Sequence, residues 1–267
     1  MRLVDGFIQK IVQKPIFHKE FFAKLKSFKD MEDIDVEEIE NLRLLGLPIT
    51  KYNNYAFTLE TLSTSISEQK FCIVDIETNG SKPSTDQIIE IGAVMIQGGK
   101  EIGRFSSLVK ADILPDSIAQ LTGISLKELE DAPSLKSVLE SFRLFLKDAV
   151  FVAHNVNFDY YFISTSMEKA GFGPLLNRRL CTIDLARKTL EAPKYGLGSL
   201  MAHLGFSFEH HHRALCDAQA TVLILLKCLE HLPEEIISVE ELIFFAKPNQ
   251  KRKKEKKVNK SATDTTS

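Results

Sequence analysis

Residues 71–77 have the sequence FCIVDIE, in which four apolar residues lead into two acids separated by an isoleucine. The pattern predicts a buried strand, and because alternate side chains of a strand point to one face, Asp75 and Glu77 project together. Two such carboxylates repel each other, which is destabilising unless a cation or a catalytic task requires both charges. The simpler alternative is a strand that ends in solvent. The choice depends on whether other carboxylates converge on this pair.

The residues after this strand predict an α/β domain. Alternating apolar residues at 87–96, a turn at Gly98-Gly99 and a third run at 101–109 predict sequential antiparallel strands. An uncharged run at 149–153 predicts a strand buried on both faces. The predicted helices cover residues 115–121, 125–129, 133–147, 157–170, 195–203 and 218–229.

Two further acids stand at predicted helix starts. Asn157 is predicted as the N-cap of a helix that runs to about residue 170, which places Asp159 in its first turn. Asp217 directly precedes the apolar helix at 218–229, which is expected to pack on the sheet. An acid in either place can interact favourably with the positive end of the helix dipole, or its side chain can point inward, towards Asp75 and Glu77. Both interpretations remain open from the residues alone.

Taken in order, these acids form three motifs: D-x-E on a strand, H-N-x-x-F-D at 154–159 and H-x-x-x-x-D at 212–217. The motifs resemble those of the DEDDh 3′–5′ exonuclease family, over roughly residues 68–232. Within that family, the stretches KYGLGSL at 194–200 and LTGI at 121–124 are most similar to the proofreading epsilon-type subunits of bacterial DNA polymerase III.

The chain departs from the family pattern in two places. Asn79 follows Thr78 where many members have a second threonine, so its contribution to substrate binding is open. The first 66 residues are not part of the common domain, which leaves the partner of the protein open.

The resemblance implies an RNase H-like fold, with a mixed five-stranded sheet flanked by helices and a fifth strand near residues 179–183. It also implies two divalent ions, Mg2+ or Mn2+, because phosphodiester hydrolysis needs an activated water and stabilisation of the developing charge. Carboxylate oxygens suit these hard cations. The implied metal ligands are Asp75, Glu77, Asp159 and Asp217, and the implied catalytic base is His212, whose imidazole titrates near neutral pH. The implied substrate-binding residues are Thr78, Leu121, Thr122, Asn155 and Phe158.

Three consecutive histidines precede Asp217, and only His212 has the spacing of the family motif. It is expected on a mobile loop, because it lies five residues before Asp217, which is too far for one helical face. His210 and His211 are expected in a solvated loop. A zinc site made from these histidines and Cys216 is disfavoured, because the spacing is not that of zinc ligands.

The expected reaction is removal of nucleoside monophosphates from single-stranded or frayed DNA 3′ ends, in replication proofreading or in repair. The expected partners are a single-stranded DNA 3′ end and a DNA polymerase catalytic subunit. One alternative is a 3′–5′ exoribonuclease or a degrader of short oligonucleotides, since discrimination of the 2′-hydroxyl depends on pocket shape. Another is a nucleic-acid-binding module without catalysis, which the presence of all four acids and the histidine disfavours.

Residues 1–66 predict a small helical domain and a linker. A helix is expected at 17–28, a second helical pattern at 36–45 and a hairpin that turns at Asn53-Asn54, an order that resembles a truncated winged-helix unit. Acids between residues 32 and 40 oppose contact with phosphate, so a protein-docking or packing role is favoured over DNA binding. The exonuclease domain is assigned to residues 67–235.

The C-terminal extension, residues 236–267, is predicted to carry a disordered basic tail. Eight Lys or Arg and two acids lie from Lys247 onward, so of the 34 basic and 36 acidic residues the body keeps 26 and 34. Four cysteines without C-x-x-C spacing indicate reduced thiols in a cytoplasmic protein. A signal peptide and a membrane span are not expected.

Overall fold

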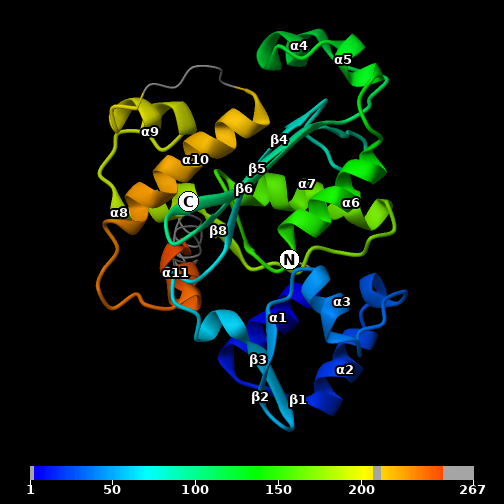
Figure 1. The fold of residues 1–267 in the computed structure, drawn as a ribbon, viewed down its shortest axis with the longest axis vertical. Helices are drawn as coiled ribbons and strands as arrows, with labels where there is room; N and C mark the ends of the chain where they lie inside the picture. Colours follow the sequence, from blue (N-terminus) through cyan, green and yellow to red (C-terminus); the bar gives the residue numbers. More distant parts are fainter. Residues whose placement is uncertain (1–2, 207–211, 249–267) are drawn as a thin grey trace, which may run out of the picture.

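The computed structural model describes residues 3–206 and 212–248, and its centre is a five-stranded sheet (Figure 1). The strand order is β6-β5-β4-β7-β8. Strands β4 (Phe71–Thr78), β5 (Ile88–Gln97) and β6 (Lys100–Leu108) are antiparallel neighbours, whereas β7 (Val150–Ala153) and β8 (Arg179–Cys181) continue the sheet in parallel with β4. The predicted mixed five-stranded α/β fold is therefore confirmed.

Helices cover both faces of this sheet because the residues of β4 alternate between two cores. Cys72 and Val74 pack with α6 (Leu135–Leu146) and α7 (Val156–Lys169) on one face. Phe71 and Ile73 pack on the other face with the helices α8 (Thr182–Thr189), α9 (Leu197–His203) and α10 (Ala214–Leu229). Asp75 continues the second row, so the alternation directs it towards the face that α10 covers. Helices α4 (Asp116–Thr122) and α5 (Leu126–Glu130) stand at the top of the sheet in Figure 1.

Some elements differ from the sequence-based expectation. The N-cap of α7 is Asn155, with φ 81° and ψ 56°, and not Asn157, because the chain turns sharply through a left-handed residue directly after β7. Helix α10 begins at Ala214, before the predicted residue 218. Helix α8 was not predicted, since its short amphipathic pattern is interrupted by polar residues.

The N-terminal residues fold around a separate apolar core. The expected helix, second helix and hairpin are present as α2 (His18–Lys26), α3 (Ile39–Leu44), β2 (Ile49–Asn53) and β3 (Ala56–Leu59). Helix α1 (Leu3–Gln13) and strand β1 (Ile16–Phe17) precede them and were not predicted. Because β1 pairs with β3, the ribbon is a three-stranded sheet in the order β1-β3-β2, and the unit is more complete than the truncated one expected.

The segment expected to be a linker, residues 61–69, is fixed in place. The buried hydroxyl of Thr61 donates to Glu240, at 2.8 Å, and Ser65 forms a β-bridge with Ser238. Glu240 lies in helix α11 (Val239–Ala246), whose apolar residues belong to the second core of the sheet. The first part of the C-terminal extension is therefore packed into the molecule through residue 246.

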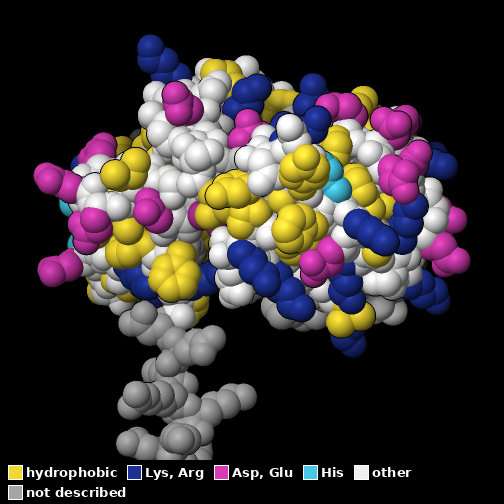
Figure 2. All heavy atoms as spheres, turned by 90° about the horizontal axis from the view of Figure 1, so that it is seen from below, with side chains coloured by type: hydrophobic (Ala, Val, Ile, Leu, Met, Phe, Trp, Pro, Cys, Tyr) yellow, Lys and Arg dark blue, Asp and Glu magenta, His cyan; other side chains and the backbone are white. Residues whose placement is uncertain are grey.

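Direct contacts also join the N-terminal unit to the sheet domain. Arg43 forms an ion pair with Asp148, at 2.9 Å, and the amide of Leu176 donates to the carbonyl of Leu45. Figure 2 shows the molecule from below, where hydrophobic side chains gather among lysine, arginine and acidic ones. The exposed aromatic residues of the N-terminal unit are Phe17, Tyr52 and Tyr55.

Within residues 3–206 and 212–248, no helix has the length and apolar character needed to cross a membrane. The predicted disordered tail lies outside the described residues from residue 249 onward.

We expect removal of the Glu240 carboxylate to destabilise the protein. Glu240 accepts two hydrogen bonds from Arg178, at 2.6 and 2.7 Å, and both side chains are buried. Glu240→Ala leaves the guanidinium buried without its counter-charge, so the free energy of unfolding should fall by about 3–5 kcal/mol. Urea denaturation measures this loss. The control is Glu235→Ala at an exposed position, and a loss no larger than the control's would contradict the assignment.

Candidate active site

Asp75 and Glu77 lie at the end of β4, beyond the point where β7 stops pairing with it. The β4–β7 pairing ends at Ile73 and Val152, whereas β4 continues to Thr78. Both acids are only partly buried, in contrast to the four fully buried residues that precede them. The end of β4 therefore presents two carboxylates at one edge of the sheet, the edge at which the carboxyl ends of the parallel strands β4 and β7 lie.

Asp159 reaches the same edge from the first turn of α7. The left-handed Asn155 turns the chain back immediately after β7, so the first turn of α7 lies beside the unpaired end of β4. The Asp159 side chain is 4% exposed and accepts a backbone hydrogen bond from Ile76, the residue between the other two acids. This bond fixes the helix acid against the strand acids.

Asp217 and His212 complete the cluster from the opposite side. Asp217 is buried in the first turn of α10, and His212 is exposed just before that helix. The potential ligand atoms of Glu77, His212 and Asp217 all lie within 4.8 Å of one another. His210 and His211 lie outside the described residues.

Burial and mutual repulsion perturb the titration of these acids. The pKa of Asp75 is raised well above its usual range, first by burial and then by Asp159, Asp217 and other acids. Burial, with the charge of Asp217, raises the pKa of Glu77 to about 8. Burial raises the pKa of Asp159 to about 7, although its backbone hydrogen bonds act in the opposite direction. Divalent cations fit this site, because they would neutralise the repulsion and the hard carboxylate oxygens suit Mg2+ or Mn2+.

The predicted substrate-binding residues occupy different environments. Leu121 is 49% exposed at the end of α4 and Phe158 is 37% exposed in the first turn of α7, so both side chains are accessible. Asn155 is also exposed. Thr122 is 4% exposed, and its hydroxyl donates to the carbonyl of Ile118. The hydroxyl of Thr78 donates to the carbonyl of Gly80, at 2.6 Å. The structure thus uses both threonine hydroxyls within the chain.

Two polar residues near the acids, Asn79 and His154, were noted in the sequence without a structural role, and the structure shows what each contacts. Asn79 donates to the carbonyl of Ile113 and accepts from the amide of Gln87, so it ties the end of β4 to the segment before α4. His154 lies 2.9 Å from both the Thr182 hydroxyl and the Tyr195 carbonyl, and burial lowers its pKa to about 4. His154 is therefore neutral at physiological pH and links two sequence motifs.

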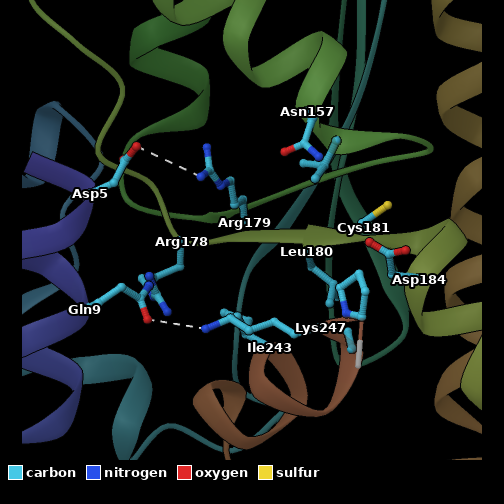
Figure 3. Close-up of a pocket in the computed structure, with 13 residues that line it drawn as sticks. Asp5, Gln9, Asn157, Arg178, Arg179, Leu180, Cys181, Asp184, Ile243 and Lys247 are labelled. Atoms are coloured by element: carbon cyan, nitrogen blue, oxygen red, sulfur yellow. Dashed lines mark hydrogen bonds and ion pairs between the residues drawn. The ribbon is translucent and has the colours of Figure 1, made fainter. Parts of the chain in front are cut away.

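A pocket of about 360 Å3 lies away from the four acids, along β8 and between α1, α8 and α11 (Figure 3). Contacts between opposite walls bridge it: Lys247 donates to Gln9, at 3.3 Å, and Arg179 lies 4.0 Å from Asp5. None of the four clustered acids lines this pocket, which is a gap between the N-terminal unit and the sheet domain.

Comparison with known proteins gives consistent matches. The exonuclease family model RNase_T matches residues 72–225. The DNA polymerase III PolC-type of Staphylococcus haemolyticus is 37% identical over 171 residues, which is 63% of this chain and 12% of that protein. The corresponding protein of Staphylococcus epidermidis is 36% identical over 172 residues, again 12% of its length. The chain thus spans about an eighth of these relatives.

Two solved structures share the fold. Exonuclease I of E. coli, in complex with a dT13 oligonucleotide, has a TM-score of 0.55 and 20% identity, covering 61% of this chain and 41% of that one. Exonuclease X, in complex with 5′ overhanging duplex DNA, has a TM-score of 0.51 and 23% identity, covering 66% of this chain and 99% of that one.

The metal-free protein is expected to lose stability as the pH rises. The pKa of Glu77 is about 8 in the folded protein, above its ordinary 4.5, so the stability that its protonation contributes is fully present below about pH 4.5 and is lost as the pH rises through about 8. Glu77→Gln removes this titration and should flatten the dependence of the melting temperature on pH. Thermal unfolding in EDTA across this range tests it.

Glu235→Gln, at an exposed position, is the matched control and should retain the wild-type slope. Added Mg2+ should restore stability most at the alkaline end, where the carboxylates are ionised. The same slope in the Glu77→Gln and wild-type proteins would show that this carboxyl does not titrate as described.

Proposed function

The chain belongs to the exonuclease family whose model matches residues 72–225, and from this premise we propose that it removes nucleoside monophosphates from DNA 3′ ends in a metal-dependent reaction. The observation that carries the proposal is the convergence of four acids and one histidine at one edge of the sheet. Two acids come from β4, and one comes from the first turn of each of α7 and α10.

The four carboxylates are the proposed metal ligands. The charges of Asp159, Asp217 and Glu77 all raise the pKa of Asp75, so Asp75 lies within electrostatic reach of the other three acids. By resemblance to the family, Asp75 would contribute to holding both ions, Glu77 and Asp217 would hold one of them, and Asp159 would hold the other. Bound Mg2+ or Mn2+ would supply activation of water and stabilisation of the charge on the phosphate and the departing 3′-oxygen.

His212 is the proposed general base. Its side chain is exposed and lies within ligand distance of Glu77 and Asp217, so it is accessible to water and to the reacting phosphate. A neutral imidazole can accept the proton of the attacking water near physiological pH.

Single-stranded or frayed DNA is the proposed substrate. The accessible Leu121 and Phe158 side chains offer apolar contacts for unstacked terminal bases without reading their sequence. The curated relatives are DNA polymerases, and a structure with the same fold holds a DNA oligonucleotide. Both similarities favour DNA over RNA, and the polymerase relatives favour proofreading, with a polymerase catalytic subunit as partner.

Loss of any one clustered acid should abolish cleavage. Asp75→Asn, Glu77→Gln, Asp159→Asn and Asp217→Asn each remove a charge that holds the cations, and His212→Ala should lower turnover by roughly a hundredfold. The assay follows 3′-end degradation of single-stranded DNA and RNA of one sequence, with Mg2+, Mn2+ or EDTA. Glu235→Gln is the control.

Full activity of an acid variant, or cleavage by the wild type in EDTA, would exclude the two-metal proposal. Faster cleavage of RNA than of DNA would transfer the proposal to the exoribonuclease alternative.

Leu121→Ala should raise KM for single-stranded DNA several-fold with little change in kcat, because this exposed side chain contacts bases and not the reacting atoms. Steady-state kinetics measure both constants, and thermal unfolding checks that stability is unchanged. Leu126→Ala is a matched control, because Leu126 is also exposed, at 39%, and begins the adjacent helix α5. Parallel losses of stability and activity would show that Leu121 serves packing.

A further inference from the structure

A buried acid on β5 holds the start of α10. Glu90 is 2% exposed, accepts a hydrogen bond from the amide of Ala214, at 3.0 Å, and pairs with Arg213. Both Nη2 and Nε of the guanidinium contact the carboxylate, at 2.9 and 3.3 Å. The N-cap residue of α10, Arg213, makes no capping hydrogen bond with its own side chain. Glu90 therefore caps this helix from a neighbouring strand.

The register of the sheet places this contact directly opposite the metal-binding acids. Glu90 pairs with Glu77 across the β4–β5 ladder, and Gly92 pairs with Asp75. A Cβ atom on Gly92 would lie 2.1 Å from the amide nitrogen of Leu215, so only glycine allows the backbone of α10 to come this close. The residues of β5 that pair with Asp75 and Glu77, namely Gly92 and Glu90, are thus the residues that contact the start of α10.

Electrostatics alone would disfavour a carboxylate at this position. Glu90 adds a fifth negative charge beside four others, and its charge raises the pKa of Asp75 and of Glu77. Arg213 compensates, since it acts on Glu77 in the opposite direction. An apolar residue at this position would avoid the repulsion. The hydrogen bonds of Glu90 to Arg213 and to the amide of Ala214 therefore explain why a carboxylate lies here.

The residue directly before this anchor is His212, whose backbone has φ 65°. A non-glycine residue in this region is strained and persists only where the surroundings fix it. Arg213 is fixed by three hydrogen bonds from its side chain to Glu90, and the amide of the next residue, Ala214, donates a fourth. The anchored residue therefore limits the directions in which the adjacent imidazole can point.

We propose that the Glu90–Arg213 pair is a positioning device that aims His212 at the attacking water; this inference rests on the proposed exonuclease function. The pair touches neither substrate nor reacting atoms and acts through the base. A purely structural role for the pair would act instead through the fold of α10 or through Asp217, which this helix carries.

A double-mutant cycle separates the two roles, because it measures whether two residues act through each other. The variants are Arg213→Ala, His212→Ala and the pair together, assayed with 3′-labelled single-stranded DNA at saturating Mg2+. Arg213→Ala should lower kcat by about ten- to a hundredfold, as loss of a supporting residue typically does, with KM changed less than about twofold. In the His212→Ala background the same change should lower kcat by less than about twofold, since the base that it positions is absent.

Two further variants and a binding measurement complete the test. Arg213→Lys keeps the charge but not the two-pronged contact, so it should be impaired nearly as much as Arg213→Ala. Lys227→Ala breaks an exposed ion pair with Glu230 at the other end of α10 and should leave kcat unchanged. Mn2+ affinity, measured by calorimetry above the pKa of Glu77, should not be weaker in Arg213→Ala than in the wild type, because the variant loses a positive charge beside the acids.

Equal losses from Arg213→Ala in both backgrounds, or weaker Mn2+ binding, would overturn the inference and assign the pair to the helix and its metal ligand. The inference would also be overturned if the wild-type protein is active and both Arg213→Ala and Arg213→Lys retain its full kcat. A wild-type protein without nuclease activity in any metal would instead overturn the proposed function on which the inference rests.

Discussion

Repulsion among four neighbouring carboxylates is the constraint around which the sheet domain is built. Like charges in a partly buried place raise one another's pKa, and the domain tolerates this only because its other elements hold the acids in place. Asp75 and Glu77 are fixed by a central strand paired on one side along its whole length. Asp159 and Asp217 lie in the first turns of helices, where the helix dipoles favour negative charge. Bound cations would neutralise the remaining repulsion among the four carboxylates, which the protein itself offsets only in part.

The lengths of the strands explain how acids from distant parts of the chain meet. Strand β7 is four residues long and stops pairing two residues before Asp75, which leaves room for the first turn of α7 beside β4. On the other face, Gly92 lets the start of α10 approach β5, and Glu90 receives it. One helix from each face therefore delivers an acid to the same edge, and the central strand supplies the other two.

The N-terminal unit is held to this domain by polar contacts as well as by apolar packing. Glu240 joins Thr61 from the segment after the unit to Arg178 from the start of β8, all three with little exposure to solvent. Such an arrangement stabilises one geometry, because a buried charge requires its partners. The unit lies at the end of the molecule opposite α4 and α5 (Figure 1). A protein-docking or packing role, the interpretation that the sequence favours for this unit, would leave the acid cluster accessible.

The sequence by itself predicted every strand except β1, most of the helices, and the four acids that the fold brings together. Period-two alternation and the run of apolar residues before Asp75 are local signals, as is the spacing of His212 and Asp217. Strand β1 was not predictable, because it is two residues long and exists through its pairing with β3; α11 was missed although its sequence carries a helix signal, the capping box of Ser238 and Glu241. Only the tertiary structure decided that the segment at 61–69 is pinned and that Glu90 meets Arg213 from 123 positions away. These features depend on contacts between residues distant in the chain, and no local pattern of side chains encodes such contacts.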